Sequence, residues 1–459
     1  MGGGARGGAR PGGAGRPRGA TAVAAQAPAR RAVRGRAAAQ RPGQGAEAGA
    51  AVNAPDPLGW PGYRDQVARA RERTGGVESV SWRRTRRAVE VVFDFRFLGG
   101  SVGTATGDVV EAAFGQARAA GLPVVSRIST GGSRMQEGML SLRQLQRVAA
   151  LCARHRAAGL PHVSVLGDPT TGGLWASLGA GADYVIAVAG AQVGFAGSRV
   201  RPADDPAYTA EGQFAAGAVD LVAEPGDVDA LVAAVLELLT RGDAVPAEVP
   251  RALGAEDLPA DGWDAVLRAR APERPRAARY LDDYFDLRVP VNGDRAGGVD
   301  PGVLCGIGLR GERPVAFAAQ TGTATTPAGF RTASRLIRLA ERFALPVLTL
   351  VDTPGAANDP AAERAGVGPA IAELFTVVAE SRVPVTTLVI GEGGSGGALA
   401  LASPEHTWIT PDAYFSVIAP ELAANILKRD DVPALADDLR LRPQDLVELG
   451  VVRGIASHG

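Results

Sequence analysis

The sequence predicts an α/β protein that consists of two similar halves, and two observations lead to this class. Short β-branched segments alternate with glycine-rich turns and longer helical segments from near Pro57 onward, an order that gives parallel sheets covered by helices. The order then starts again in the second half. The matched dipeptides, each pair 223 residues apart, are Leu122-Pro123 with Leu345-Pro346, Leu160-Pro161 with Val383-Pro384, and Phe195-Ala196 with Ile418-Ala419. Three pairs at one distance favour domain duplication over the alternative that unrelated α/β domains share X-Pro before a strand.

The first half is expected to contain four strands and three long helices. Helix 108–120 should stop at Gly121 and Pro123, since neither residue continues a helix. Helix 228–240 carries leucine and valine at helical spacing, and Asp227 stands where an N-cap is expected. The strands are 88–95, 124–128, 163–166 and 184–188, and the third helix is 139–158.

The second half follows a proline-rich connector. Five prolines between residues 243 and 278 indicate a connector with one short helix at 263–269. The pattern then repeats, with strands expected at 315–319, 347–351 and 385–390 and helices at 328–343 and 366–380.

The N-terminal segment differs from the rest. Residues 1–46 hold nine Arg and no Asp or Glu, embedded in Gly and Ala, which is too little apolar area to form a core. We expect a solvated tail rather than an RNA-binding arm. The predicted domains are a disordered Arg/Gly/Ala-rich tail at 1–53, an N-terminal domain at 54–245, a connector at 246–278 and a C-terminal domain at 279–459.

Bulk composition argues against several classes of protein. The formal net charge is +0, so no overall field attracts nucleic acid or a membrane surface. Two cysteines, Cys152 and Cys305, cannot complete a four-cysteine zinc site. No apolar run approaches the roughly 18–20 residues that a membrane helix needs. We therefore expect a cytoplasmic protein with no bound metal and no membrane or nucleic-acid partner.

Each half places glycine-rich turns directly after buried strands. The first half has turns at 129–134 and 168–173, and the second half has turns at 352–355 and 391–397. Paired glycines at a strand-to-helix turn expose backbone N–H groups, and two such donors near a helix N-terminus form an oxyanion site. One Gly-Gly alone is usually only a tight turn, but duplicated positions favour function.

Other chemistries have weaker signals. Segment 391–396 matches the dinucleotide fingerprint, but it follows a late strand and its counterpart lacks the pattern. Ser395 does not lie in the Gly-x-Ser-x-Gly elbow of a hydrolase. None of the four histidines, which are His155, His162, His406 and His458, stands beside a plausible nucleophile. Many oxyanion-type turns and few bases favour a reaction whose substrates supply the base.

Two sets of motifs resemble known subunits. Five motifs of the first half resemble the β subunit of bacterial acetyl-CoA carboxylase carboxyltransferase. They are PLGWPGY at 57–63, DFRFLGG at 94–100, GGSRMQEG at 131–138, DPTTGG at 168–173 and GFAG at 194–197. Five motifs of the second half resemble the α subunit of the same enzyme. They are YFDL at 284–287, PAGFR at 327–331, DTPG at 352–355, GEGGSGGA at 391–398 and SVIAPE at 416–421. The fused order also resembles the single-chain β subunits of actinobacterial acyl-CoA carboxylases. The resemblance implies a crotonase-like (ClpP/crotonase) ββα-spiral fold in each half.

Three departures from the family pattern concern the zinc ribbon and the biotin side. The four-cysteine ribbon is absent, so no zinc is expected. A basic stretch of the family is shortened to 321–326, and the family's DTPGAYPG reads DTPGAAND at 352–359. The last two lie where biotin or its carrier should approach.

The resemblance implies a carboxyltransferase that moves a carboxyl group from carboxybiotin, on a separate carrier protein, to acetyl-CoA or a short acyl-CoA. The product would be malonyl-CoA, for the first committed step of fatty acid or polyketide precursor synthesis. Biotin's ureido nitrogen would take the α-proton. Biotin carboxylase and biotin carboxyl carrier protein would be partners, and a homo-oligomer is implied.

The resemblance also implies roles for individual residues. The Gly131 and Gly132 amides would hold the thioester oxygen, and the Gly397 and Ala398 amides the ureido oxygen. The other binding residues would be Gly172, Gly173, Phe195, Gly393, Gly394, Gly396, Pro354 and Gly355.

Three alternatives stay open. A biotin-independent malonyl-CoA-type decarboxylase would use the same fold and oxyanion turn. A crotonase-like hydratase would need paired carboxylates, for which Glu137 and Glu392 are candidates. The chain could also be a non-catalytic scaffold subunit of a carboxylase complex.

Overall fold

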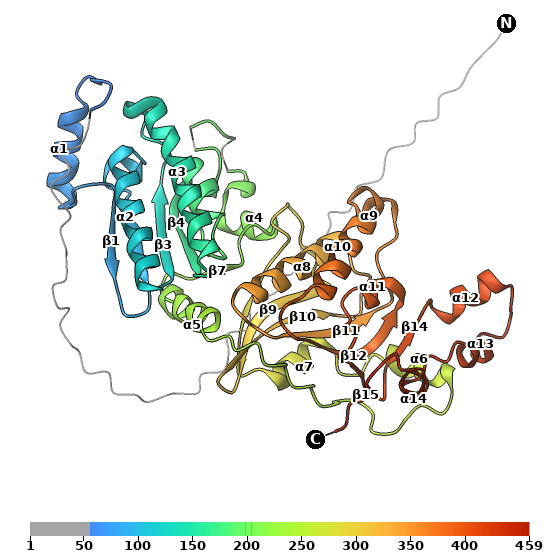
Figure 1. The fold of residues 1–459 in the computed structure, drawn as a ribbon. Coiled ribbons are helices and arrows are strands. Elements are labelled where there is room, and N and C mark those ends of the chain that lie inside the picture. Colours follow the sequence, from blue (N-terminus) through green and yellow to red (C-terminus); the bar gives the residue numbers. More distant parts are fainter. Residues whose placement is uncertain (1–55, 198, 203, 459) are drawn as a thin grey trace, which may run out of the picture. The chain divides into compact units, whose positions relative to one another are not determined.

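A computed structural model describes residues 56–458 except 198 and 203, so the predicted tail at 1–53 lies wholly outside the described residues. The first half contains a seven-stranded sheet in which only β1 is antiparallel to its neighbour (Figure 1). Its order is β1 (Val80–Arg84), β2 (Val89–Phe93), β3 (Val124–Thr130), β4 (His162–Thr171), β5 (Tyr184–Val188) and β7 (Leu221–Ala223), with β6 (Val193–Gly194) paired to β4. The four predicted strands are therefore confirmed, and β4 runs five residues beyond the predicted end.

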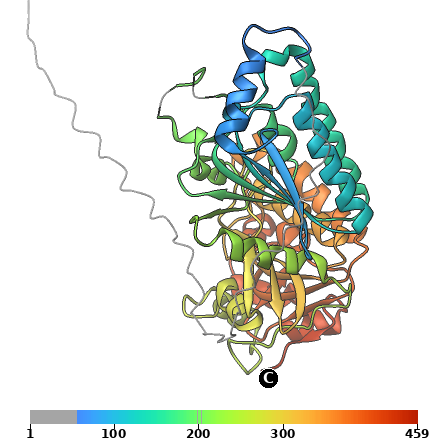
Figure 2. The same ribbon diagram turned by 90° about the vertical axis from the view of Figure 1, so that its left-hand side faces the viewer.

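Helices cover both faces of this sheet. On one face, α2 (Thr104–Ala120) and α3 (Gly138–Ala157) pack together (Figure 2) and bury Val124 and Ile128 of β3. The other face, which includes Val125, packs against α5 (Val228–Thr240). Helix α2 starts four residues earlier than predicted but ends at a left-handed Gly121 as expected. The shorter helices are α1 (Tyr63–Thr74) and α4 (Ala210–Ala215).

One capping prediction is wrong. Helix α5 has the predicted bounds, but the Asp227 side chain accepts no capping hydrogen bond. Its backbone is already helical, at φ −97° and ψ −14°, whereas an N-cap carboxylate reaches the first amides from an extended backbone. Apolar periodicity, rather than this cap, sets the position of α5.

The second half contains an eight-stranded sheet with the same parallel centre. Its order is β15 (Gly454–Ile455), β13 (Thr407–Ile409), β12 (Val385–Gly394), β11 (Val347–Thr353), β10 (Arg313–Gln320), β9 (Val303–Arg310) and β8 (Leu287–Pro290), with β14 (Tyr414–Ser416) paired to β12. The predicted strands and helices are present within a few residues. The helices of this half are α8 (Pro327–Arg342), α9 (Pro360–Arg364), α10 (Val367–Ala379), α11 (Ser395–Leu399), α12 (Pro420–Leu427), α13 (Val432–Asp438) and α14 (Pro443–Glu448).

The connector is more structured than a tether. It contains the predicted short helix, α6 (Gly262–Arg270), and leads into α7 (Ala277–Tyr284). The segment before α6 packs with α7 on the face of the second sheet that α8 and α10 leave open. The described residues all belong to one compact unit, so the predicted domain limits at 245 and 278 stay predictions.

Hydrogen bonds repeat between the halves at the distance found in the sequence. Val102 forms a parallel bridge with Ser133, and Thr325 forms the same bridge with Ala356, 223 residues later in both positions. The register of the central strands repeats equally, since Thr130 pairs with Thr170 and Thr353 with Gly393. The internal duplication is therefore present in the backbone around the glycine-rich turns.

The two halves share a buried boundary. The Tyr184 hydroxyl donates to the Pro290 carbonyl oxygen at 2.7 Å, and one hydrophobic cluster contains side chains of β4, β5 and α5 together with β9 and α8. Among the described residues, no helix is both long and apolar enough to cross a bilayer.

Candidate active site

The four glycine-rich turns follow β3, β4, β11 and β12 at the carboxyl ends of these strands. Because β3 pairs in parallel with β4 and β11 with β12, the turns meet in two pairs, one in each half. Loops at the carboxyl ends of parallel strands are the usual place for ligands in open α/β sheets. Each half therefore presents one candidate site of the same construction.

In the first half, the two turns touch through glycine backbones. A Cβ on Gly172 would lie 3.0 Å from the Cα of Gly132. Both glycines have positive φ, +74° for Gly172 and +102° for Gly132. Any side chain here would be strained and would separate the turns.

The amides of the first-half glycines are largely engaged within the chain. Gly131 N–H donates to the Gly99 carbonyl oxygen at 2.8 Å, and Gly132 N–H donates to Thr130 Oγ1 at 3.0 Å. Gly172 N–H donates to the carbonyl oxygens of Gly194 and Phe195. Gly131 and Gly132 are expected to hold the thioester oxygen, and each of their amides donates to an acceptor within the chain. Their role at the thioester stays a prediction.

In the second half, the backbone amides at the start of α11 are free to bind a ligand. Helix α11 begins at Ser395, which has a φ of +54°, and no side chain caps it. The first N–H groups of a helix have no intrahelical acceptor, so the amides of Gly396 and Gly397 are available. Ala398 is the fourth helical residue, and in regular helix geometry its amide faces the carbonyl oxygen of Gly394.

The predicted residues of the second half do come together. A Cβ on Gly397 would lie 2.7 Å from the carbonyl carbon of Gly355 and closer still to the Ala356 amide nitrogen. A Cβ on Gly394 would lie 2.7 Å from the Gly355 amide nitrogen, near the carbonyl group of Pro354. The turn after β11 thus packs directly on the turn after β12.

The 223-residue distance also gives the residues at the start of α11 counterparts in the first half, which sequence reasoning did not single out as donors. The left-handed Ser395 corresponds to the left-handed Gly172 at the 223-residue distance. Gly396 and Gly397 then correspond to Gly173 and Leu174, which open the turn before a π-helical segment at Trp175–Gly179. No hydrogen bond joins the Gly173 amide to a turn or loop acceptor within the described part of the chain. The distance itself was the signal that could have found this pair.

Phe195 lies at the rim of the first-half turns, directly after β6. Its side chain is 71% exposed, while its carbonyl oxygen accepts from Gly172 N–H at 3.1 Å. The backbone therefore supports the turn, and the ring is available for contact with a ligand.

A buried ion-pair cluster anchors the turn after β11. Asp352 is fully buried and accepts from Arg274 at 2.6 Å and from Arg276 at 3.2 Å. The Glu392 backbone N–H also donates to this carboxylate, at 3.2 Å. Asp352 thus ties the ends of β11 and β12 to the connector. Sequence reasoning found the motif but not the two arginines, which lie more than 70 residues upstream.

The two glutamates of the hydratase alternative are both engaged in their own halves. Glu137 is completely buried and accepts from the Tyr63 hydroxyl at 2.6 Å and from Thr104. Glu392 accepts from Arg270 and from the Tyr414 hydroxyl, each at 2.8 Å. They form no carboxylate pair, so the hydratase alternative loses its candidate acids.

The histidines of the first half are buried structural residues. His155 Nε2 lies 3.1 Å from the Pro161 carbonyl oxygen, and His162 Nε2 lies 2.9 Å from Ser126 Oγ. Burial lowers the pKa of His162 to about 4, which keeps it neutral near neutral pH. Neither residue belongs to a glycine-rich turn.

No group of three or more His, Cys, Asp or Glu side chains could hold a metal ion in the described part of the chain. Cys152 and Cys305 are buried in separate halves, and burial raises the pKa of each thiol to about 12. Zinc binds thiolates, so neither buried thiol is in the form that binds zinc.

We predict less than about a tenth of an equivalent of zinc per chain, because no site among the described residues supplies enough ligands. Elemental analysis after chelator washing checks this, and one retained zinc per chain would refute it.

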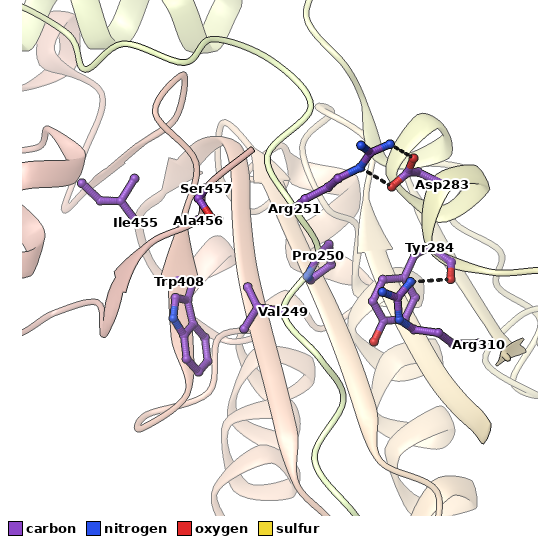
Figure 3. Close-up of a pocket in the computed structure, with 10 residues that line it drawn as sticks. All are labelled: Val249, Pro250, Arg251, Asp283, Tyr284, Arg310, Trp408, Ile455, Ala456 and Ser457. Carbon is purple, nitrogen blue, oxygen red and sulfur yellow. Dashed lines mark hydrogen bonds and ion pairs between the residues drawn. The ribbon is translucent and has the colours of Figure 1, made fainter. Parts of the chain in front are cut away.

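A separate open groove of about 600 Å³ lies between the connector and β13 (Figure 3). Arg251 pairs with Asp283 there, and Arg310 Cζ lies 4.2 Å from the centre of the Tyr284 ring. The groove is lined by Val249, Pro250, Arg251, Asp283, Tyr284, Arg310, Trp408, Ile455, Ala456 and Ser457. None of the predicted site residues lines it, and both arginines already have carboxylate partners.

Comparison with protein families matches both halves. Residues 68–276 match the carboxyl transferase domain, and residues 259–458 match the acetyl co-enzyme A carboxylase carboxyltransferase-like family. Curated relatives include the acetyl-coenzyme A carboxylase carboxyl transferase subunits beta/alpha of Salinispora arenicola, 39% identical, with 87% of this chain and 77% of the relative covered. A probable biotin-dependent acyl-coenzyme A carboxylase beta3 subunit of Mycobacterium bovis is 32% identical, with 86% and 84% covered.

Solved structures show the same fold. A transcarboxylase 12S structure, described as a hexamer assembly with methylmalonyl-coenzyme A bound, superposes with a TM-score of 0.69 at 21% identity, covering 82% of this chain and 78% of that one. A single-chain, multi-domain long-chain acyl-CoA carboxylase superposes with a TM-score of 0.66 at 23% identity, covering 81% and 38%. The predicted duplicated crotonase-like fold is confirmed. On these sequence matches, the chain belongs to the acetyl-coenzyme A carboxylase carboxyltransferase family, with a beta-like and an alpha-like half on one polypeptide.

Proposed function

We propose that this chain transfers a carboxyl group from carboxybiotin, held on a separate carrier protein, to acetyl-CoA or a short acyl-CoA. With acetyl-CoA the product is malonyl-CoA, which would begin fatty acid or polyketide precursor synthesis. The observation that carries the proposal is the two equivalent pairs of glycine-rich turns, one pair in each half, within a chain of this family.

The start of α11 has the groups that a ureido ring requires. The amides of Gly396 and Gly397 lie in the first helical turn, and no side chain caps it. Backbone N–H donors held in place stabilise negative charge without reorganisation. Bound carboxybiotin supplies the carboxyl group and, on its ureido nitrogen, the base. We assign Gly397 as the main donor to the ureido oxygen, and Ala398 supports the same turn.

In the first half, we place the donors in the turn after β4 in place of Gly131 and Gly132. The amides of Gly173 and Leu174 hold the charge that develops on the thioester oxygen when the α-carbon loses its proton. Gly132 and Gly172 keep the two turns in contact, and Phe195 covers the rim. Positioning by both halves brings the reactants together.

The proposed partners follow from the family. They are biotin carboxylase, biotin carboxyl carrier protein and further copies of this chain, in the cytoplasm. The hexamer assembly described for transcarboxylase 12S supports an oligomer.

The test is exchange of label from malonyl-CoA to free biotin, repeated with methylmalonyl-CoA. Label in carboxybiotin supports the proposal, and the preferred thioester identifies the acyl group. Loss of carbon dioxide from malonyl-CoA without biotin identifies the decarboxylase alternative. No reaction with any thioester identifies a scaffold subunit.

Gly132→Val is expected to lower acyl-CoA affinity at least about tenfold. The new β-branched side chain would stand at a φ of +102° with its Cβ 3.4 Å from the Cα of Gly172, and strain of this kind costs roughly 1–3 kcal/mol. Calorimetry with an acyl-CoA measures the loss. Gly131→Ala is the matched control, since its Cβ meets only the Gly99 carbonyl oxygen, at 3.5 Å, and φ there is not positive. Equal affinities for both variants and the wild type would contradict the prediction.

Removal of residues 1–50 is expected to leave carboxyl transfer unchanged. The composition of this segment cannot support a core, and the predicted site residues all lie beyond it. The exchange assay on the shortened chain measures this. A shortened chain that keeps its oligomer size but loses activity would show that the segment contacts the carrier or another subunit.

A further inference from the structure

Gln320, the last residue of β10, stands beside the proposed biotin turn and has no role in the function described so far. Its side chain is 1% exposed. The amide nitrogen donates to the Gly397 carbonyl oxygen at 3.0 Å and to Thr325 Oγ1 at 3.0 Å. Both N–H groups of this side-chain amide are therefore used. One is directed at the turn after β12, through Gly397, and the other at Thr325.

The two acceptors belong to the two parts of the biotin side. The Gly397 carbonyl group shares its peptide unit with the Ala398 amide, inside α11. Thr325 donates its backbone N–H to the Gly355 carbonyl oxygen, and its own carbonyl oxygen accepts from Ala357, so it is paired with the turn after β11. Gln320 thus connects the turn after β11 with the turn after β12.

Helix α11 needs such a connection. It has five residues, two of them glycine, and no side chain caps its start. Glycine adds backbone freedom that opposes an ordered turn. Among the described residues, Gln320 is the one side chain that hydrogen-bonds a backbone group of α11.

The fold itself does not require an amide at this position. In the first half, β2 pairs with β3 as β10 pairs with β11, with Val89 opposite Val124 and Ala316 opposite Val347. Four residues further on in each strand stand Phe93 and Gln320, and Phe93 is buried and apolar. The same construction is therefore complete with a hydrocarbon side chain.

The amide also leaves a buried polar atom without a partner. Gln320 Oε1 is buried and has no hydrogen bond. Such atoms are rare because their lost hydration opposes folding. The Gly397 carbonyl oxygen is only an acceptor, so the nitrogen must face it and the unpaired atom must be the oxygen. A position that served packing alone would favour an apolar side chain.

We propose that Gln320 is a positioning residue of the biotin side, which fixes the Gly397–Ala398 peptide against the turn after β11 and so aims the donors of α11. The proposal rests on the proposed function, since it concerns the half assigned to biotin. It acts on the orientation of backbone amides, not on the reacting atoms.

The test compares Gln320→Met, which keeps the length of the side chain and removes its donors, with the wild-type full chain. We expect kcat/KM for free biotin to fall about 10- to 100-fold, by analogy with the loss of a group that orients a metal-binding side chain. Acyl-CoA affinity by calorimetry should stay unchanged. Hydrogen exchange without ligand should become faster at 394–400 and stay the same at 171–175.

A pair of variants at Thr325 keeps the proposal testable if Gln320→Met does not fold. Thr325→Val removes the second acceptor and should reproduce the faster exchange at 394–400 in part, whereas Thr325→Ser keeps the hydroxyl and should match the wild type. Wild-type transfer and exchange in Gln320→Met, or equal behaviour of the two Thr325 variants, overturns the proposal. A wild-type chain that transfers nothing to biotin overturns the proposed function instead, and with it the positioning role of Gln320 toward biotin.

Discussion

Replacement of Gly397 by alanine is expected to lower the rate of carboxyl transfer about 100- to 1000-fold, the usual effect of losing one oxyanion donor. A Cβ at this position would lie 2.7 Å from the carbonyl carbon of Gly355, and the Ala356 backbone would be nearer still. These atoms belong to the backbone, so they cannot move aside as the end of a flexible side chain would. The two turns must separate, and the Gly397 amide moves with them.

The matched control for this experiment is the neighbouring residue. Gly396→Ala adds a Cβ that meets no atom within 4 Å, and Gly396 does not have a positive φ. It should keep transfer within a few-fold of the wild type. Acyl-CoA affinity, measured by calorimetry, should be unchanged in both variants, because the first half is assigned to CoA. Loss of CoA affinity in Gly397→Ala with normal oligomer size would show that the halves are assigned the wrong way round.

Asp220→Ala is expected to cause a large loss of stability, about 3–5 kcal/mol, as when one partner of a buried ion pair is removed. The Asp220 carboxylate is completely buried and accepts from Arg335 at 2.7 Å and from Arg295 at 2.5 Å. It also accepts from the backbone N–H groups of Val185 and Asn292. Without the carboxylate, two guanidinium groups from the second half remain near the boundary with no counter-charge.

Urea and thermal midpoints measure this loss, with Asp229→Ala as the control. Asp229 pairs with Arg127 but its side chain is 84% exposed, and exposed pairs contribute only about 0–1 kcal/mol. Equal midpoints for the two variants would show that the Asp220 cluster does not hold the halves together.

Local patterns were enough to place most long elements. Strand 184–188 and helix 228–240 have the predicted bounds, because a continuous apolar run and a stripe of leucine and valine depend on neighbours in the sequence. The end of β4 was not foreseen. Residues Thr170 and Thr171 extend it by pairing with β6, and such a partner is visible only after folding. The short helices α12, α13 and α14, of eight, seven and six residues, were also missed, because so few turns give little apolar periodicity.

The site shows where sequence reasoning stops. The motifs located all four turns, and in the second half the turn that contains Pro354 packs on the turn that contains Gly397. The motifs could not show that Gly131 N–H donates to the carbonyl oxygen of Gly99, 32 residues earlier in the chain. Hydrogen-bond acceptors at such distances leave no local pattern. Gln320 was missed because one buried amide in an apolar strand has no motif around it.

The hydrophobic cluster shared by α5, β9 and α8 also affects the stoichiometry of the two halves. Since apolar side chains of the first half complete the core of the second, their association is an intramolecular step whose effective concentration does not depend on expression level. Cleavage within the connector would turn the same contact into an obligate heterodimer, with a dissociation constant and a dependence on dilution. Fusion therefore guarantees equal numbers of first and second halves at any cellular abundance.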